Sequence, residues 1–259
     1  MMISRFALSA ALFLSLSSLP LVAEPARELR VMSWNLHHGV GEDGTLDLER
    51  IAARIREQKP DLVVLQEVDN KCRRSKSVDQ AAELAKLTGL TGAFGKAMDH
   101  DGGEYGQAIL SKHPLGETTV HKLPGDGEPR IAFEAVVKVG EGEGEALRLV
   151  SVHLDHQQDA RRLKQAETLV AALSATKEPL VLAGDFNDVP ESPVLKAFGE
   201  KLTAVEKGGE KLTCPAKEPK VEIDHFFLRG FKAVSPVTVL PEAVASDHRP
   251  LVVTVRWGE

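Results

Sequence analysis

The chain has 259 residues, of which 42% are hydrophobic and 27% charged, so it can form one large domain with a substantial core. Its formal net charge of −6 disfavours a protein that holds nucleic acid through an extended basic surface. The stretch Lys71–Lys76 (KCRRSK) is the only dense basic segment, so a local basic patch stays open.

The first 23 residues have the layout of a secretory signal peptide. Arg5 precedes an apolar run from Phe6 to about Leu16, and small and turn-prone residues follow up to Ala23. Because the run is short and Pro20 and several serines interrupt it, a membrane anchor is disfavoured. We expect cleavage after Ala23, a secreted or periplasmic location, and a single domain over residues 24–259. Loss of Arg5 changes the net charge to −7.

The mature chain alternates between short apolar runs and amphipathic segments. The apolar runs end at glycine, proline or polar residues, which predicts strands at 28–36, 61–69, 105–115, 130–139, 146–154, 179–188, 221–230, 233–240 and 249–257. Apolar residues recur at helical spacing in three segments, which predicts helices at 46–59, 77–88 and 160–175. The glycine-rich segment 140–145 predicts a hairpin-like turn. Such a mixture predicts two face-to-face sheets with helices outside.

The two cysteines, Cys72 and Cys214, lie far apart in the sequence. In an oxidising compartment we expect a disulfide between them, with two separate thiols as the alternative.

Polar residues follow the predicted strands repeatedly. The stretch Gly184–Asp188 (GDFND) could be only a turn, since Asp and Asn are common turn residues. Similar polar groups, however, stand at or near other strand ends: Asn35, Glu67, His153, Asp185, Asn187, Asp224, Asp247 and His248. Because an unpaired buried carboxylate is costly, we expect these side chains to meet in one polar site.

Seven short motifs occur in order across residues 33–251: SWNL, LQEV, GQAILSKHP, SVHLDH, GDFND, EIDHFF and SDHRPL. Together they resemble the endonuclease/exonuclease/phosphatase superfamily, to which deoxyribonuclease I belongs. The resemblance implies a four-layer α/β/β/α sandwich and metal-dependent hydrolysis of phosphate esters.

The resemblance also implies roles for individual residues. Asn35, Glu67 and Asp247 would hold a divalent ion, Mg²⁺ or Mn²⁺, and their oxygens suit such a hard cation. Asp185 would position or deprotonate the attacking water, and Asn187 would contact the phosphate.

Two imidazoles would complete the catalytic group. His248 would contact the phosphate while Asp224 fixes its ring, and His153 would be the second imidazole across the site.

Substrate contacts are expected from Tyr105, Gln107 and Arg130. Gln107 stands where family members often carry asparagine, and Arg130 could steer an anionic substrate. For Arg73, Arg74, His37 and His38, substrate contact and a solvated loop are equal alternatives.

These observations favour an exported phosphodiesterase or phosphatase, expected to be monomeric, that acts on a small molecule or a lipid head group. A secreted endonuclease is the second interpretation. A zinc hydrolase built on His153 and His156 ranks lower, because Ser151 stands where that signature needs a histidine. A non-catalytic binding module would not need both imidazoles and all the carboxylates.

Overall fold

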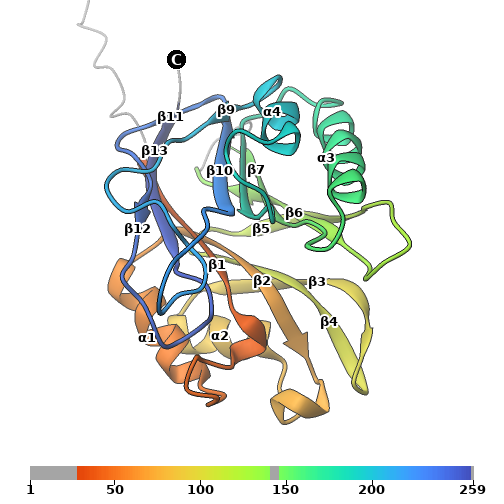
Figure 1. The fold of residues 1–259 in the computed structure, drawn as a ribbon. Coiled ribbons are helices and arrows are strands. Elements are labelled where there is room, and N and C mark those ends of the chain that lie inside the picture. The colour runs from red at the N-terminus through yellow and green to blue at the C-terminus, as the bar shows by residue number, and fades with distance from the viewer. Residues whose placement is uncertain (1–27, 141–145, 258–259) are drawn as a thin grey trace, which may run out of the picture.

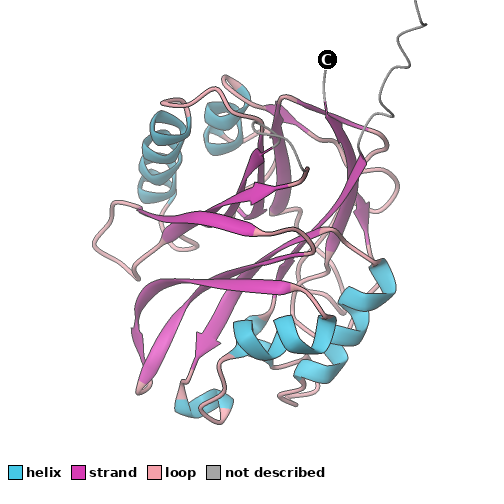
Figure 2. Cartoon of the chain, turned by 180° about the vertical axis from the view of Figure 1, so that it is seen from behind, coloured by secondary structure: helices cyan, strands magenta, loops and turns pink. Residues whose placement is uncertain are grey.

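The computed structural model describes residues 28–140 and 146–257. The expected signal peptide and most of the predicted turn at 140–145 lie outside the described residues. Two mixed β-sheets pack face to face, and helices cover the outer face of each sheet (Figures 1 and 2). The predicted four-layer sandwich is therefore confirmed.

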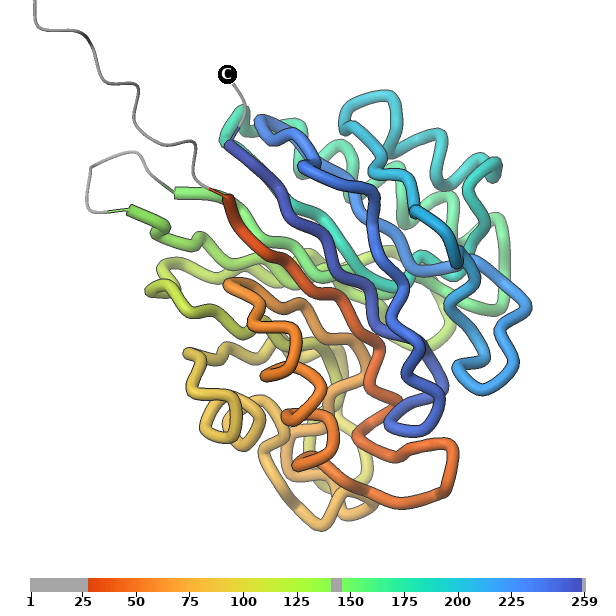
Figure 3. The backbone as a smooth tube through the Cα atoms, turned by 90° about the vertical axis from the view of Figure 1, so that its left-hand side faces the viewer, coloured from red at the N-terminus to blue at the C-terminus, as the bar shows by residue number. Residues whose placement is uncertain are grey.

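The first sheet has the strand order β11-β13-β1-β2-β4-β3, with β12 paired to β13. Its strands are β1 (Glu28–Asn35), β2 (Leu62–Asn70), β3 (Thr91–His100), β4 (Gly103–Ser111), β11 (Phe231–Ala233), β12 (Thr238–Val239) and β13 (Leu251–Trp257). Helices α1 (Leu48–Gln58) and α2 (Gln80–Thr88) begin after Asp47 and Asp79, whose side chains accept backbone N–H groups of the first turn. In Figure 3 the red N-terminal strand β1 runs beside the blue C-terminal strand β13.

The second sheet has the order β5-β6-β7-β8-β10-β9. Its strands are β5 (Leu115–Lys122), β6 (Ile131–Lys138), β7 (Ala146–His153), β8 (Leu180–Asp185), β9 (Thr203–Ala204) and β10 (Asp224–Arg229). Helices α3 (Asp159–Leu173) and α4 (Pro193–Gly199) cover its outer face.

Three apolar layers hold the sandwich together. The central layer lies between the sheets and includes Val31, Val64, Phe133 and Val181. The outer two layers lie between each sheet and its helices. Because β1, β2, β7 and β8 are buried on both faces, their sequences read as nearly continuous apolar runs rather than as alternating patterns.

Each sheet contains one parallel strand pair joined through a helix. In the first sheet α1 connects β1 to β2, and in the second α3 connects β7 to β8. The parallel register places Asn35 beside Gln66 and His153 beside Asp185. These strand ends lie on the same side of the sandwich, since the side chains of Asn35 and Asp185 are hydrogen-bonded across the two sheets.

Several details differ from the predictions. Strands β3, β5 and β9 and helix α4 were not predicted. Of the strand predicted at 233–240, only the last residue of β11 and the two residues of β12 are extended, with Ser235 and Pro236 between them. Pro236 cannot donate a backbone hydrogen bond, which explains the break. Within the described ranges, no helix is long and apolar enough to cross a bilayer.

The disulfide prediction was wrong, because both cysteines are free thiols. The Cys72 thiol is buried and donates to the carbonyl oxygens of His100 at 3.1 Å and Glu104 at 3.2 Å. Cys214 instead lines the cleft described next.

Candidate active site

A cleft of about 440 Å³ opens where the strand ends of the two sheets meet. Six of the nine histidines of the chain line it, together with carboxylates and two arginines. Eight predicted site residues share this cleft: Glu67, Tyr105, Arg130, His153, Asp185, Asn187, Asp247 and His248. Residues that are up to 181 positions apart in the sequence therefore converge on one polar surface.

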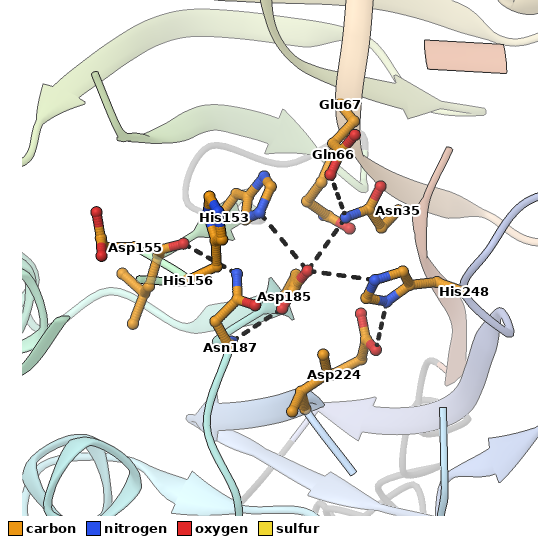
Figure 4. A network of polar contacts seen from close by, with 12 residues as sticks. Asn35, Gln66, Glu67, His153, Asp155, His156, Asp185, Asn187, Asp224 and His248 are labelled. Carbon is orange, nitrogen blue, oxygen red and sulfur yellow. Dashed lines mark hydrogen bonds and ion pairs between the residues drawn. The ribbon is translucent and has the colours of Figure 1, made fainter. Parts of the chain in front are cut away.

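Asp185 lies at the centre of the polar contacts (Figure 4). Its Oδ2 accepts a hydrogen bond from Asn35 Nδ2 at 3.1 Å and lies 3.6 Å from His153 Nε2 and 3.7 Å from His248 Nε2. Its Oδ1 accepts the backbone N–H of Asn187 at 2.8 Å. Burial, opposed by His248, raises the pKa of Asp185 to about 7.

The GDFND turn places Asp185 because Gly184 allows β8 to approach β7 closely. Gly184 has φ +149°, and a Cβ atom there would lie 2.0 Å from the carbonyl oxygen of Val152. Asn187 adopts φ +51°, which asparagine tolerates better than most residues. Its Nδ2 donates to the carbonyl oxygen of Leu154 at 3.0 Å, so the turn is tied to the segment that follows β7.

His248 and Asp224 form a buried pair. Asp224 begins β10 opposite Asp185 in the antiparallel register, and its Oδ2 lies 2.9 Å from His248 Nδ1. Burial alone would lower the pKa of His248, but the carboxylates of Asp224 and Asp185 raise it well above its usual value. The indole N–H of Trp34 donates to the His248 carbonyl oxygen at 2.8 Å and fixes the backbone. His248 is therefore held as a cation, with Nε2 directed toward Asp185.

His153 has the opposite charge preference. Burial, together with the adjacent Arg130 guanidinium, lowers the pKa of His153 well below its usual value. Arg130 Nη1 lies 2.9 Å from His153 Nδ1, and Arg130 Nη2 lies 3.0 Å from His156 Nδ1. A guanidinium within hydrogen-bonding distance of both imidazoles disfavours a zinc ion held between His153 and His156.

Glu67 and Asp247 offer the cleft carboxylate oxygens of the kind that a hard cation prefers. Glu67 lies at a β-bulge with φ +55°, and its Oε1 accepts Asn35 Nδ2 at 3.1 Å, while Oε2 makes no hydrogen bond within the described residues. Among residues 28–140 and 146–257, Asp247 Oδ1 accepts a hydrogen bond only from the Ser246 hydroxyl, at 3.3 Å. The two carboxylates fit a Mg²⁺ or Mn²⁺ ion that keeps several waters.

The Asn35 side chain, which was expected to bind the divalent ion, makes hydrogen bonds to other residues of the site. Its Oδ1 accepts the backbone N–H of His37 at 3.1 Å, and its Nδ2 is shared between Glu67 and Asp185. Asn35 thus orients two carboxylates here, and its role as a direct metal ligand stays a prediction.

Ligand atoms of Asp185, Asp224 and His248 also lie within 4.8 Å of one another, which is close enough for a metal ion. The 2.9 Å hydrogen bond between Asp224 and His248 already occupies two of these groups. This pair is therefore suited to proton and charge chemistry, and metal binding by Glu67 and Asp247 stays a prediction.

The sequence of residues 32–248 matches the family model described as Endonuclease/Exonuclease/phosphatase family. The chain belongs to this family. The match contains nearly every site residue described above, from Asn35 to His248. Members of this family are hydrolases that act on phosphate esters.

Several individual proteins resemble this family member. The uncharacterized protein YbhP of Escherichia coli (strain K12) is 27% identical over 168 residues, which cover 61% of this chain and 66% of YbhP, just under two thirds of its length. The endonuclease/exonuclease/phosphatase of Beutenbergia cavernae DSM 12333 is 27% identical with a TM-score of 0.70, over 90% of this chain and 72% of that one. The mannosyl-6-phosphatase of Bacteroides thetaiotaomicron VPI-5482 shares the fold at 20% identity, with a TM-score of 0.72 over 88% and 99% of the two chains.

The remaining predicted residues divide into two groups. His37, His38 and Arg74 line the cleft of this family member, whereas Arg73 is exposed and pairs with Asp101 outside it. Gln107 lies outside the cleft: its Nε2 donates to the Ile131 carbonyl oxygen at 2.7 Å.

Two buried supports of the site were not predicted. Ser246 Oγ donates to the Asn35 carbonyl oxygen at 2.7 Å and so joins the Asp247 loop to β1. Arg162 donates to Asp188 Oδ2 at 3.0 Å and to the Asp155 carbonyl oxygen at 2.9 Å. A signal for Arg162 was available, because it shares the buried face of its helix with Ala166 and Leu169.

Proposed function

We propose that the protein is a divalent-metal-dependent phosphoesterase in which water attacks the phosphorus atom. One observation carries the proposal: the buried Asp185 carboxylate lies within 3.7 Å of two imidazoles, His248 and His153, and charged neighbours shift the pKa of His248 up while burial and Arg130 shift the pKa of His153 down. Glu67 and Asp247 line the same cleft.

Asp185 is the residue that receives the water proton. It faces the cleft from the end of β8, and Asn35 and Asn187 fix both of its oxygens. A carboxylate held in this way can orient a water molecule and accept its proton as the bond to phosphorus forms.

His248 stabilises the negative charge that develops on the phosphate and the leaving oxygen. Asp224 holds the ring through Nδ1, which leaves Nε2–H free to donate to an oxygen anion. His153 is neutral and lies between Asp185 and Arg130, whose Nη1 is within 3.0 Å of both ring nitrogens and whose charge adds to the attraction for the phosphate.

Glu67 and Asp247 would hold the divalent ion, with Asn35 orienting Glu67. When bound, the ion supplies positive charge to a phosphate oxygen and to the leaving oxygen.

The charges around the cleft favour a small phosphate ester over nucleic acid. Of the four cations in the KCRRSK stretch, only Arg74 lines the cleft, and Arg73 is paired with Asp101. A nucleic-acid backbone needs a series of free cations along its path. We further propose that the protein acts outside the cytoplasm, which rests on the layout of residues 1–23.

The test is hydrolysis by the purified chain that starts at Glu24, with Mg²⁺, with Mn²⁺ and with EDTA. The substrates are p-nitrophenyl phosphate, bis-p-nitrophenyl phosphate, sphingomyelin, inositol phosphates and plasmid DNA. Asp185→Asn and His248→Ala should each lower kcat by about 10³-fold or more while thermal unfolding stays cooperative. His121→Ala, which removes an imidazole outside the cleft lining, is the matched control.

The outcomes separate the alternatives. Metal-dependent cleavage of the small or lipid esters supports the proposal, and DNA nicking that His248→Ala abolishes would make the protein a nuclease. Full activity of either catalytic variant would overturn the mechanism. No cleavage of any substrate would favour a binding module.

A further inference from the structure

One wall of the cleft is not used by the proposed chemistry. It consists of Arg74, Met98, His100 and Tyr105, which we call the far wall. Met98, Tyr105 and Asp69 lie side by side on the neighbouring strands β3, β4 and β2, since Asp69 and Met98 each pair with Tyr105 in the strand register. Arg74 belongs to the short turn Arg73–Ser75 that follows β2.

Arg74 is held rigidly at this wall. Its Nε and Nη2 donate to the two oxygens of Asp69 at 2.9 and 2.8 Å, and the Asp69 side chain is fully buried. Its guanidinium carbon lies 5.4 Å from the centre of the Tyr105 ring, which is within the range of a cation–π contact. Two independent contacts therefore fix the plane of the guanidinium.

One edge of Arg74 remains available to a ligand. Nη1 makes no hydrogen bond within the described part of the chain, and the side chain is 32% exposed. Arg130, the other arginine of the cleft, differs because His153, His156 and Glu128 already contact both of its terminal nitrogens. Arg74 is thus the arginine of this cleft with a terminal nitrogen that contacts no acceptor among the described residues, whereas the free donor of Arg130 is its buried Nε.

The far wall also offers an apolar surface beside that cation. The Tyr105 and His100 rings lie 6.0 Å apart, and the Met98 side chain lines the cleft with them. Glu67 lies on β2 two residues before Asp69, and Asn35 Nδ2 donates to both Glu67 and Asp185, so β2 joins this wall to the Asp185 centre. A substrate whose phosphate lies at Asp185 and His248 can extend its alcohol portion over the rings toward Arg74.

We propose that Arg74 and the far wall form a leaving-group subsite that selects phosphate esters whose alcohol portion carries a second anionic group, a carboxylate or a phosphate. This inference rests on the proposed function for the position of the ester. A planar guanidinium with a fixed orientation and one free edge is suited to such a group.

The test compares substrates that differ only in the second anion. Phenyl phosphate, 4-carboxyphenyl phosphate and hydroquinone bisphosphate share one ring, and the corresponding methyl diesters cover the diesterase case. In the wild type, kcat/KM for a substrate with the second anion should exceed kcat/KM for phenyl phosphate about 10- to 100-fold. This is the range expected of one charge-assisted hydrogen bond. The carboxylate and phosphate substrates show which anion is preferred.

The variants are chosen to avoid an unpaired buried charge. The double variant Asp69→Asn/Arg74→Gln removes both charges and keeps two groups that can hydrogen-bond. Arg74→Lys keeps the charge but loses the planar guanidinium. This variant replaces the double variant in the test if the double variant does not fold. Arg73→Ala is the matched control, because Arg73 is the neighbouring arginine, is 76% exposed and does not line the cleft.

Loss of the charged-substrate ratio in the Arg74 variants, with the ratio kept in Arg73→Ala, supports the subsite. A ratio near one in the wild type, or an equal ratio in wild type and variants, overturns it.

A binding assay separates this inference from the proposed function. Titration calorimetry of the same proteins with benzylphosphonate and 4-carboxybenzylphosphonate measures the preference without turnover. If no ester is cleaved but the carboxyl group tightens binding in an Arg74-dependent way, the subsite stands and the proposed function fails. If esters are cleaved and neither assay shows the preference, the function stands and the subsite is refuted.

Discussion

His225, the residue after Asp224, should make stability depend on pH in a measurable way. Its side chain is 8% exposed, Nε2 lies 2.9 Å from the Asp188 carbonyl oxygen, and Nδ1 lies 3.3 Å from Lys207 Nζ. A neutral ring that donates through Nε2 and accepts through Nδ1 satisfies both contacts. Burial, together with Lys207, lowers the pKa of His225 to about 3.

The lowered pKa predicts the sign and size of the effect. Below pH 6.5 the unfolded chain binds a proton at His225 that the folded chain does not bind, so stability falls as the pH falls toward 3. The pKa of His225 in the unfolded chain is near 6.5, and each pH unit corresponds to about 1.36 kcal/mol. The loss in the free energy of unfolding is therefore about 2 kcal/mol at pH 5 and nearly zero at pH 8.

The assay is urea unfolding of wild type and His225→Gln from pH 8 to pH 5, followed by tryptophan fluorescence. The glutamine variant is less stable at pH 8, since it loses packing against the Phe186 ring. Its deficit should shrink by about 2 kcal/mol on going to pH 5, because glutamine does not titrate. A deficit that stays constant across this range would refute the assignment of a buried neutral imidazole.

Two further predictions concern the supports of the site. Gly184→Ala should destabilise the fold by about 3 kcal/mol or more, because its Cβ would overlap the Val152 carbonyl oxygen. The control in urea unfolding is Gly199→Ala, because a Cβ atom there meets no atom within 4 Å. Equal losses of stability in the two variants would argue against the close approach of β7 and β8. Arg162→Met should lower kcat about tenfold or more with a smaller change in KM, because Asp188 and the Asp155 carbonyl oxygen lose the donor that they share. Arg162→Lys should recover part of the lost kcat. The exposed Lys164→Met is its control, and steady-state kinetics in which KM alone changes would contradict a positioning role.

Much of the sandwich could be predicted because its central strands are buried on both faces. The apolar runs around Val31, Val64 and Val181 need no knowledge of the fold to be recognised as strands. Strand β3 was missed because Thr91–His100 mixes glycines and polar residues and lies partly exposed at the sheet edge. Helix α4 has only seven residues, which is too short for a helical period to stand out.

Many of the residues that line the cleft could be predicted from the sequence, but their contacts could not. Motif order identified Asp185, His248 and Glu67, since each follows an apolar run or precedes one. Nothing local in the sequence indicates that Arg130 contacts two imidazoles, or that Asn35 donates to carboxylates rather than offering its oxygen. Such contacts depend on how the two sheets pack. Whether Cys72 and Cys214 form a disulfide depends on the same long-range geometry.

The central apolar layer acts as a spacer that sets the dimensions of the cleft. Asn35 and Glu67 come from one sheet, whereas His153 and Asp185 come from the other, so the distance between them follows from the side chains packed between the sheets. Face-to-face sheets lie about 10 Å apart, and a larger core side chain separates or tilts them. Turnover can thus be tuned from the interior, by changing the volume of residues such as Val64 or Val181, without altering any group that meets the substrate.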